Sequence, residues 1–181
     1  MYEMKSIGVR ITGISPLLLH RFPLEGTPAG YAKWSPEKQA EFATYRDPDT
    51  HELRVQSEAI RQSMIAAAKW TKGKGRASLK ADVAAVVEIE PEWLSLGTTE
   101  YKIDTRSVVN ATTKGRVLSH RPRLHEWALS LTLVYDPVLV TPAQLREVLD
   151  NAGRRIGIGD FRPENLGHFG KFLVSEWKSQ D

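Results

Sequence analysis

Two segments of this chain combine several lysines and arginines with no acidic residue. The first, residues 69–80 (KWTKGKGRASLK), contains Lys69, Lys72, Lys74, Arg76 and Lys80. The second, residues 106–123 (RSVVNATTKGRVLSHRPR), contains Arg106, Lys114, Arg116, Arg121 and Arg123. Grouped cations neutralise phosphates and release the counterions condensed around them, which strengthens nucleic-acid binding. One such segment is typical of a solvated loop, but two in one small chain favour a phosphate-binding surface.

A third candidate for phosphate binding is the stretch IGIGDFRPENLGHFGKF at residues 156–172. Its glycines bracket a segment that we name the glycine-rich turn (residues 157–170), and they are Gly157, Gly159, Gly167 and Gly170. Glycine lacks a Cβ, so backbone N–H groups can approach a phosphate closely, and Arg154, Arg155 and Arg162 add positive charge. The stretch is neither a Walker loop nor a dinucleotide fingerprint, because no GK[ST] follows and the glycines precede a strand. The alternative interpretation is a helix-capping glycine followed by a bulge.

Aromatic side chains beside these cations could stack on bases, which contributes about 1–3 kcal/mol per base. Trp70 lies directly beside the first basic segment, and Phe161 lies inside the glycine-rich turn. We expect both to be stacking platforms. Trp127 and Trp177 fall on predicted strands and are expected in the core.

The histidines give little sign of catalysis. The chain has five histidines and no cysteine, and it lacks an HExxH motif or paired-ligand spacing, so no metal or cofactor is predicted. His20 is the one catalytic candidate, because it follows the first predicted strand and could transfer a proton if a cationic partner stood nearby. A histidine there more commonly bonds backbone. Asp47 and Asp49 indicate an Asp-Pro-Asp turn. We therefore predict a protein that is not an enzyme.

Length and composition are typical of one domain with a hydrophobic core. The chain has 181 residues, 41% of them hydrophobic, and a net charge of +3. No run of 18 apolar residues occurs, and the amino-terminal residues contain no apolar signal region. Together with the absence of cysteine, this predicts a cytoplasmic protein without a membrane span.

Hydrophobic periodicity predicts the elements that would position these residues. Alternation at residues 6–13 and 126–135 indicates strands, and the first of these could continue through SPLLLHRFP. Residues 57–69 form a predicted helix capped by Ser57, and residues 141–152 one that begins with a Thr141–Gln144 capping box. Further predictions are a short helix at residues 36–44, strands at 83–89 and 169–177, and a hairpin from 100–109 and 116–121.

This order of elements predicts the α+β class with a ferredoxin-like βαββαβ topology. Such a fold has an antiparallel sheet with two helices on one face. We expect one domain over residues 1–181 with two insertions. One is a long loop after strand 1, at about residues 21–56, and the other is a hairpin or thumb between strands 2 and 3, at about residues 92–124.

Two stretches carry a resemblance to a known family. The order GIG, short polar loop, GHFGKF, between the second helix and the last strand, resembles the glycine-rich loop of the RAMP superfamily of CRISPR systems. That superfamily contains guide-RNA-processing nucleases and the backbone subunits that coat a guide RNA. The helix SEAIRQSMIAAAK is similar to the first helix of the backbone subunits, which lies beneath the RNA. The run GRRIGIGDFRP also resembles uncharacterised phage and prophage proteins.

The resemblance implies a single RAMP-like, RNA-binding domain that acts in antiviral defence as a repeating subunit of an oligomeric ribonucleoprotein. Its partners would be single-stranded nucleic acid, with RNA favoured over DNA, copies of itself and other subunits of an effector complex. The hairpin would reach over the nucleic acid or a neighbouring subunit. One alternative is a metal-independent endoribonuclease using His20, because a histidine near that place assists 2′-hydroxyl attack in processing members. Another is a phage structural or assembly protein whose basic loops meet acidic partners.

Overall fold

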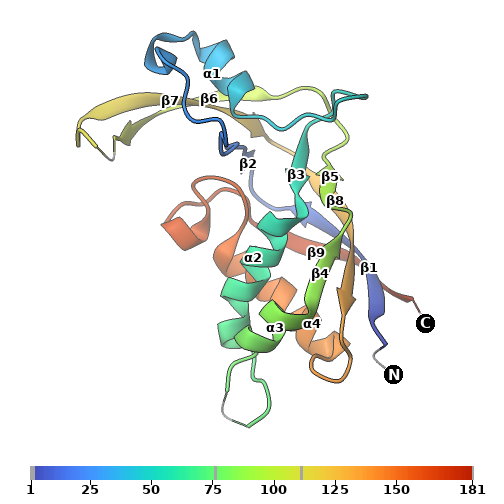
Figure 1. The fold of residues 1–181 in the computed structure, drawn as a ribbon. Helices are drawn as coiled ribbons and strands as arrows, with labels where there is room; N and C mark the ends of the chain where they lie inside the picture. Colours follow the sequence, from blue (N-terminus) through green and yellow to red (C-terminus); the bar gives the residue numbers. More distant parts are fainter. Residues whose placement is uncertain (1–2, 76, 111, 181) are drawn as a thin grey trace.

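The computed structural model describes residues 3–75, 77–110 and 112–180, so the predicted phosphate-binding Arg76 lies outside the described residues. Its body is an antiparallel sheet of four strands, ordered β4 (Val87–Glu90), β8 (Ala128–Tyr135), β1 (Lys5–Gly13) and β9 (Phe172–Gln180) (Figure 1). Alternation fixes the register of the two central strands. Ile7 pairs with Leu133 and Val9 with Leu131, and all four side chains are buried.

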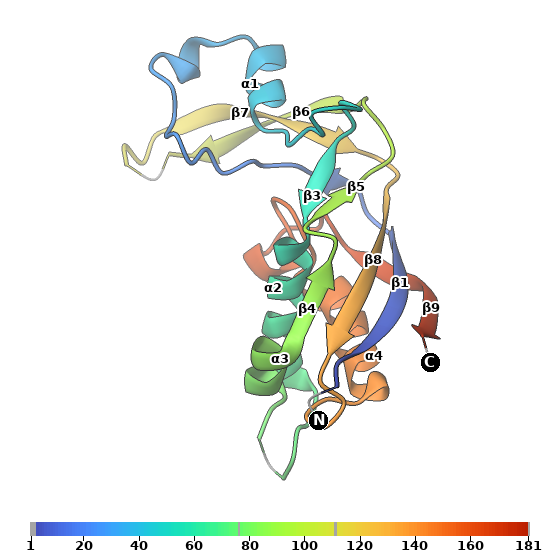
Figure 2. The ribbon, with the colours of Figure 1, turned by 45° about the vertical axis from the view of Figure 1, so that its right-hand side comes forward.

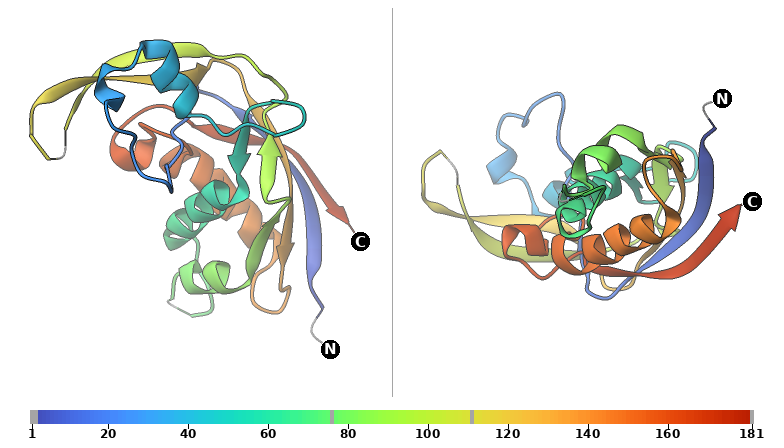
Figure 3. Two further views of the ribbon diagram at one scale, coloured as in Figure 1. Left: turned by 45° about the horizontal axis from the view of Figure 1, so that its top comes forward. Right: turned by 90° about the horizontal axis from the view of Figure 1, so that it is seen from below.

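Three helices cover one face of this sheet: α2 (Ser57–Ala67), α3 (Lys80–Val86) and α4 (Pro142–Asn151) (Figure 3). In α2, Ile60 and Met64 lie four residues apart on one helix face and are both fully buried, so this face packs into the core. The capping box of α4 is confirmed, because the Thr141 hydroxyl accepts from the Gln144 N–H and the Gln144 side chain accepts from the Thr141 N–H. The fold is therefore mixed α+β, as predicted.

Two local predictions in this layer are wrong. Residues 83–89 were expected to form one strand, but Val83 and Val86 belong to α3, where they lie three residues apart and are buried together. Only the second half of the run is a strand, because β-branched residues suit a buried helix face as well as a sheet. Ser57 does not cap α2. Gln56 occupies the N-cap position without a capping side-chain bond, and Ser57 is buried in the first turn.

A second lobe lies at one end of the body. It contains β2 (Leu17–Leu18), η1 (Tyr31–Lys33), α1 (Pro36–Phe42), β6 (Lys102–Val109) and β7 (Arg116–Leu124). We call residues 17–43 and 102–124 the hairpin lobe. The β6–β7 hairpin and the short helix are confirmed. The predicted extension of strand 1 is wrong, because Leu17 and Leu18 leave that sheet and pair with β7. The hairpin projects past the helices, on the side of the sheet that they cover (Figures 1 and 2).

A two-stranded sheet of β3 (Arg54–Gln56) and β5 (Trp93–Ser95) connects the two parts. It joins the end of the first predicted insertion to the start of the second, so both insertions build one lobe. The rings of Tyr45 and Trp93 are 5.0 Å apart, and the Arg54 guanidinium lies 4.1 Å from the Trp93 ring. This stacking supports the junction between body and lobe.

Short helical turns flank the glycine-rich turn and the first basic segment. The 3-10 turn η2 (Ala68–Trp70) extends α2, the π-helical turn η3 (Ala152–Ile156) extends α4, and η4 (Pro163–Asn165) lies within the glycine-rich turn. The last strand begins at Phe172 rather than at Phe169, because residues 157–170 fold as a separate turn. In the described ranges no helix has the length and apolar character needed to cross a bilayer.

Candidate nucleic-acid interface

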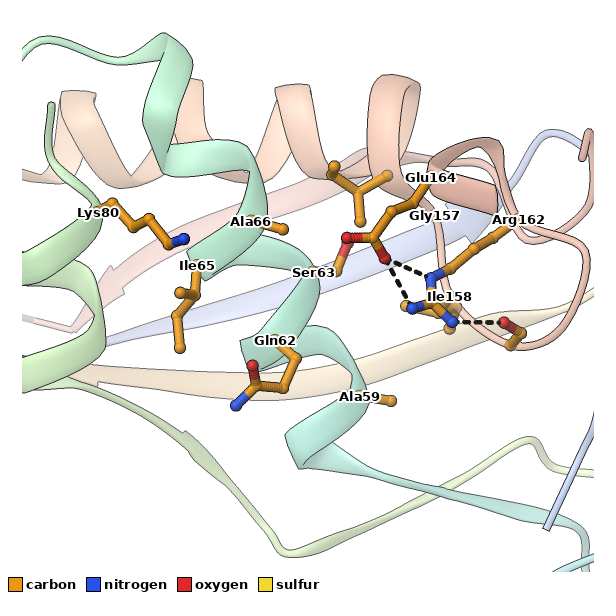
Figure 4. A pocket seen from close by; sticks show the side chains of 12 residues that line it. Ala59, Gln62, Ser63, Ile65, Ala66, Lys80, Gly157, Ile158, Arg162 and Glu164 are labelled. Carbon is orange, nitrogen blue, oxygen red and sulfur yellow. Dashed lines mark hydrogen bonds and ion pairs between the residues drawn. The ribbon is translucent and has the colours of Figure 1, made fainter. Parts of the chain in front are cut away.

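A groove of about 470 Å³ separates α2 from the glycine-rich turn (Figure 4). Ala59, Ser63 and Ala66 lie along its α2 side, and their spacing of four and three residues places them on one helix face. Arg162 and Glu164 line the opposite wall, together with the backbone of residues 157–159. Lys80 stands at the end remote from the turn (Figure 4). The small side chains of the helix face leave room for a ligand.

Ser63 is the polar group of this face. Its side chain belongs to a residue that is only 3% exposed, and its hydroxyl has no hydrogen-bond partner among the described residues. A buried hydroxyl without a partner costs about 1–3 kcal/mol. The exposed Gln62 side chain lies beside it along the groove. The hydroxyl oxygen is closed to solvent in this structure, so it can bond a ligand in the groove only after the side chains around it shift.

The amides of the glycine-rich turn are not bare, contrary to our expectation. The N–H of Gly157 donates to Ala152 O at 2.8 Å, that of Gly167 to Arg162 O at 3.0 Å, and that of Gly170 to Pro16 O at 2.8 Å. The glycines serve close packing. A Cβ on Gly167 would lie 1.7 Å from Phe161 O, and one on Gly170 would lie 1.8 Å from Ile158 O. These three amides therefore hold the turn together and do not form a phosphate cradle.

Two arginines predicted to bind phosphate are engaged by carboxylates. Arg162 bonds Glu164 at 2.9 and 2.7 Å and also donates to Gly159 O (Figure 4). Arg106 forms a two-pronged contact with Asp104 at 2.5 and 2.7 Å, and these bonds hold the pKa of Asp104 below its usual value.

The ring of Phe161, the second predicted stacking platform, is in contact with the Arg106 guanidinium. The Arg106 guanidinium lies 4.9 Å from the Phe161 ring and 4.6 Å from the Phe169 ring. The base of the hairpin is thereby packed against the glycine-rich turn. Phe161 is half-buried in this contact, which makes it part of the junction between lobe and body.

The other predicted cations keep their charge available. In the part of the chain that the structure describes, no carboxylate lies within ion-pair distance of a set of exposed side chains, namely Lys69, Lys72, Lys74, Lys80, Lys114, Arg116, Arg154 and Arg155. These groups can neutralise phosphates without first breaking an ion pair.

Trp70 joins two of the predicted segments. Lys69 Nζ lies 4.3 Å from the Trp70 ring, and the Arg155 guanidinium lies 4.8 Å from it. We name Lys69, Trp70 and Arg155 the Trp70 cluster. Arg155 directly precedes Ile156, which lines the groove, whereas the three residues of the cluster are not themselves lining residues. The Gln144 side chain of α4 donates to Lys72 O at 3.1 Å, which anchors the loop that follows Trp70.

The second basic segment is divided by the geometry of the hairpin. Arg121 pairs with Asp160 of the glycine-rich turn, and Arg123 lies 3.8 Å from Asp104. Lys114 and Arg116 instead belong to the far end of the hairpin, which projects past the helices (Figure 1). The base of the hairpin therefore meets the glycine-rich turn, whereas its tip does not.

His20 stands where the lobe meets the body. It lines two cavities, of about 230 and 210 Å³, the first of which adjoins the groove. Desolvation by its neighbours lowers the pKa of His20, and the positive charge of Arg121 lowers it further, while Asp160 opposes both. The neighbouring Arg21 pairs with Glu25. The cation that lowers the pKa of His20 is thus Arg121, which lies 101 positions later in the sequence. Only the pairing of β2 with β7 brings these two residues together.

The acidic turn at residues 47–50 forms as predicted. The Asp47 carboxylate accepts the N–H groups of Asp49 and Thr50, both at 2.9 Å. Among the described residues, no group of three or more His, Cys, Asp or Glu side chains is arranged to hold a metal ion.

The sequence did not indicate Gln62 and Ser63 of the groove, nor Phe22 and Tyr45, which line the cavity of about 230 Å³ beside His20. The spacing of Ala59, Ser63 and Ala66 could have indicated the groove, because it places a stripe of small residues next to the apolar stripe that contains Ile60 and Met64. No family model matches this chain, and no curated protein does. Function is therefore inferred from the groove and its charges.

Proposed function

We propose that this chain binds single-stranded nucleic acid, RNA in preference to DNA, along the groove between α2 and the glycine-rich turn, and does not cleave it. The observation that carries the proposal is the groove itself, which is lined by Lys80 and by Ser63, whose hydroxyl has no hydrogen-bond partner among the described residues. The Trp70 cluster holds two further cations, and its Arg155 directly precedes the groove residue Ile156. A sugar-phosphate backbone offers oxygens to Ser63 and negative charge to Lys80. RNA adds the 2′-hydroxyl, which both donates and accepts hydrogen bonds.

The contacts expected along this path are mainly electrostatic. Lys69, Lys80 and Arg155 would neutralise phosphates near the groove, with Lys72, Lys74 and Arg154 around them. Trp70 is exposed and would stack on a base. Such contacts position a strand without reading its sequence.

The architecture supports two further parts of the proposal. Strand order β4-β8-β1-β9, with α2 and α4 on one face, supports a ferredoxin-like βαββαβ topology, and hence kinship with the RAMP superfamily. The projecting hairpin, with Lys114 and Arg116 near its end, supports a contact with a bound strand or with a neighbouring copy of the chain. We therefore propose a cytoplasmic, repeating subunit of a ribonucleoprotein in antiviral defence, in contact with other effector subunits.

Salt dependence tests the electrostatic core of this proposal. We expect the affinity for a single-stranded RNA oligonucleotide to fall steeply between low and moderate salt. Lys69→Gln and Lys80→Gln should each reduce the slope of log affinity against log salt by about 0.7, the value for one lost phosphate contact. Lys178→Gln is the matched control, because Lys178 lies on β9 and pairs with Glu176. A wild-type affinity that did not change with salt would contradict the proposal.

A second candidate function is metal-independent RNA cleavage, favoured by the position of Arg121 beside His20. The lowered pKa leaves His20 neutral at pH 7, so its ring could accept the proton of a 2′-hydroxyl that attacks the adjacent phosphorus. The P–O5′ bond would break, and the departing 5′-oxygen would take a proton from water. Arg121 would stabilise the negative charge on the phosphorane oxygens, although it also pairs with Asp160. Incubating labelled RNA with chelator and either wild type or His20→Ala separates the two functions. Cleavage that His20→Ala abolishes supports the nuclease, and intact RNA with both proteins supports binding alone.

A further inference from the structure

A second cavity of about 230 Å³ lies next to the groove, toward the hairpin lobe. Ala59, Ile158 and Gly159 line both spaces, so the two cavities are immediate neighbours. The volume of the second cavity lies below the roughly 300–1,000 Å³ of pockets for drug-sized ligands. It suits one planar ring system better than a whole nucleotide. We name it the ring pocket.

Aromatic rings and apolar side chains form its walls. Leu19 and Val55 are buried there, and the rings of His20, Phe22 and Tyr45 line the same space. Phe22 is 72% exposed, which is unusual for a large apolar ring and contributes little to the core. With its pKa lowered, His20 presents a neutral ring. These walls favour the face of an uncharged aromatic ligand.

Polar side chains also belong to the lining of the ring pocket. Arg54 belongs to its lining, and the Nε atom of Arg54 is buried without a hydrogen-bond partner among the described residues. The Tyr45 hydroxyl accepts the Phe22 N–H at 3.3 Å, and the exposed Gln56 side chain stands at the rim. Aromatic faces with polar edges match a nucleobase, which has apolar faces and hydrogen-bonding edges.

We propose that the ring pocket takes one nucleobase of the strand whose sugar-phosphate backbone occupies the groove. This inference rests on the proposed function and adds a base-binding subsite to it. The base leaves the stack of its neighbours and enters between Phe22 and Tyr45. The adjoining phosphates remain near α2 and the glycine-rich turn. Phe22 is thereby a binding residue, although it lies outside every basic segment.

The test combines one variant with two oligonucleotides. Phe22→Ala removes an exposed ring, so it should leave the fold intact, which thermal melting checks. We expect this variant to weaken binding of a mixed-sequence RNA about tenfold, the loss of one base–aromatic stack. The same variant should change the affinity for an equally long strand made only of abasic sites by less than about twofold, which we treat as no effect. For each strand, the ratio of wild-type to variant affinity should be the same at every salt concentration.

Two further variants sharpen the result. Leu24→Ala is the matched control, because Leu24 is 91% exposed, belongs to the same segment and lies outside the ring pocket. Tyr45→Phe keeps the second ring but removes the hydroxyl that accepts the Phe22 N–H, so it should weaken binding of the mixed-sequence RNA less than Phe22→Ala does. Crosslinking of a photoreactive base to Phe22 or Tyr45 would report the contact directly.

The outcomes separate this inference from the proposed function. Salt-dependent RNA binding that Phe22→Ala leaves unchanged, or weakens equally for both strands, overturns the base subsite alone. Failure of the wild-type chain to bind either strand overturns the proposed function and the subsite together.

Discussion

Asp104 shows how one carboxylate determines which arginines are available to a ligand. It lies on β6, its side chain is only 8% exposed, and it contacts both Arg106 and Arg123. Arg106 in turn lies against Phe161 and Phe169 of the glycine-rich turn. Asp104 therefore orients a guanidinium that holds the hairpin to the body.

Replacing this carboxylate should destabilise the chain in a pH-dependent way. Asp104→Asn leaves Arg106 without its charged partner, so we expect a loss of about 1–3 kcal/mol at pH 7. The pKa of Asp104 is lowered by folding, from about 3.9 in an unfolded chain. Its contribution is therefore full above about pH 4 and is lost as the pH falls toward the lower folded value.

Urea unfolding of wild type and Asp104→Asn at pH 7 and at pH 3 measures this difference. The difference in the free energy of unfolding between the two proteins should be large at pH 7 and smaller at pH 3. Asp49→Asn, in an exposed turn, serves as the control and should behave as wild type. A gap that stayed constant over this range would contradict the assignment of Asp104.

Residue types in the sequence predicted the candidate site in part. The first basic segment and Arg155, which lies just before the glycine-rich turn, do meet at Trp70. The availability of each cation could not be predicted, because it depends on partners such as Asp160, which lies 39 positions from Arg121. The acid-free segment was defined as residues 106–123, so it left out Asp104, the carboxylate that pairs with Arg106.

At the scale of elements, the glycine-rich turn depends on close backbone contacts. Gly170 and Gly30 have similar positive φ angles, 68° and 76°, but differ in their surroundings. A Cβ on Gly30 would meet nothing within 4 Å, whereas one on Gly170 would lie 1.8 Å from a carbonyl oxygen.

Alanine at these two positions separates backbone strain from crowding. Gly30→Ala should cost about 1–2 kcal/mol, the strain of the left-handed conformation. Gly170→Ala should cost about 1–3 kcal/mol more, because the added methyl group forces the backbone apart. Chemical denaturation at 25 °C measures both. Equal losses would mean that the turn opens freely around Gly170.

Elements with strong local signals were predicted well from the sequence. The capping box of α4, the alternation of β1 and β8, and the hairpin around residues 110–115 all appear where expected. The strands β2, β3 and β5 were missed because they are two or three residues long and form by long-range pairing. The α3–β4 boundary was missed because VAAVVEI changes conformation within one apolar run.

At the scale of the whole molecule, the ion pair between Arg121 and Asp160 joins the hairpin lobe to the body. We expect Asp160→Asn to weaken this junction by about 1 kcal/mol. Hydrogen exchange should then accelerate in β7 and around Leu18, whose carbonyl accepts the Asp160 N–H, while β1 and β8 stay protected. Glu164→Gln in the same turn is the control. Faster exchange throughout the four-stranded sheet would instead indicate global destabilisation.

The route of the chain through the hairpin lobe limits how the lobe can move. The backbone crosses between body and lobe after β1, before β3, after β5 and after β7, so a hinge would have to bend every link together. The ring pocket is lined by residues of both parts, so it keeps its width before any ligand arrives. Encounter with an oligonucleotide should then proceed in one step, with an observed rate that rises in proportion to oligonucleotide concentration and reaches no plateau.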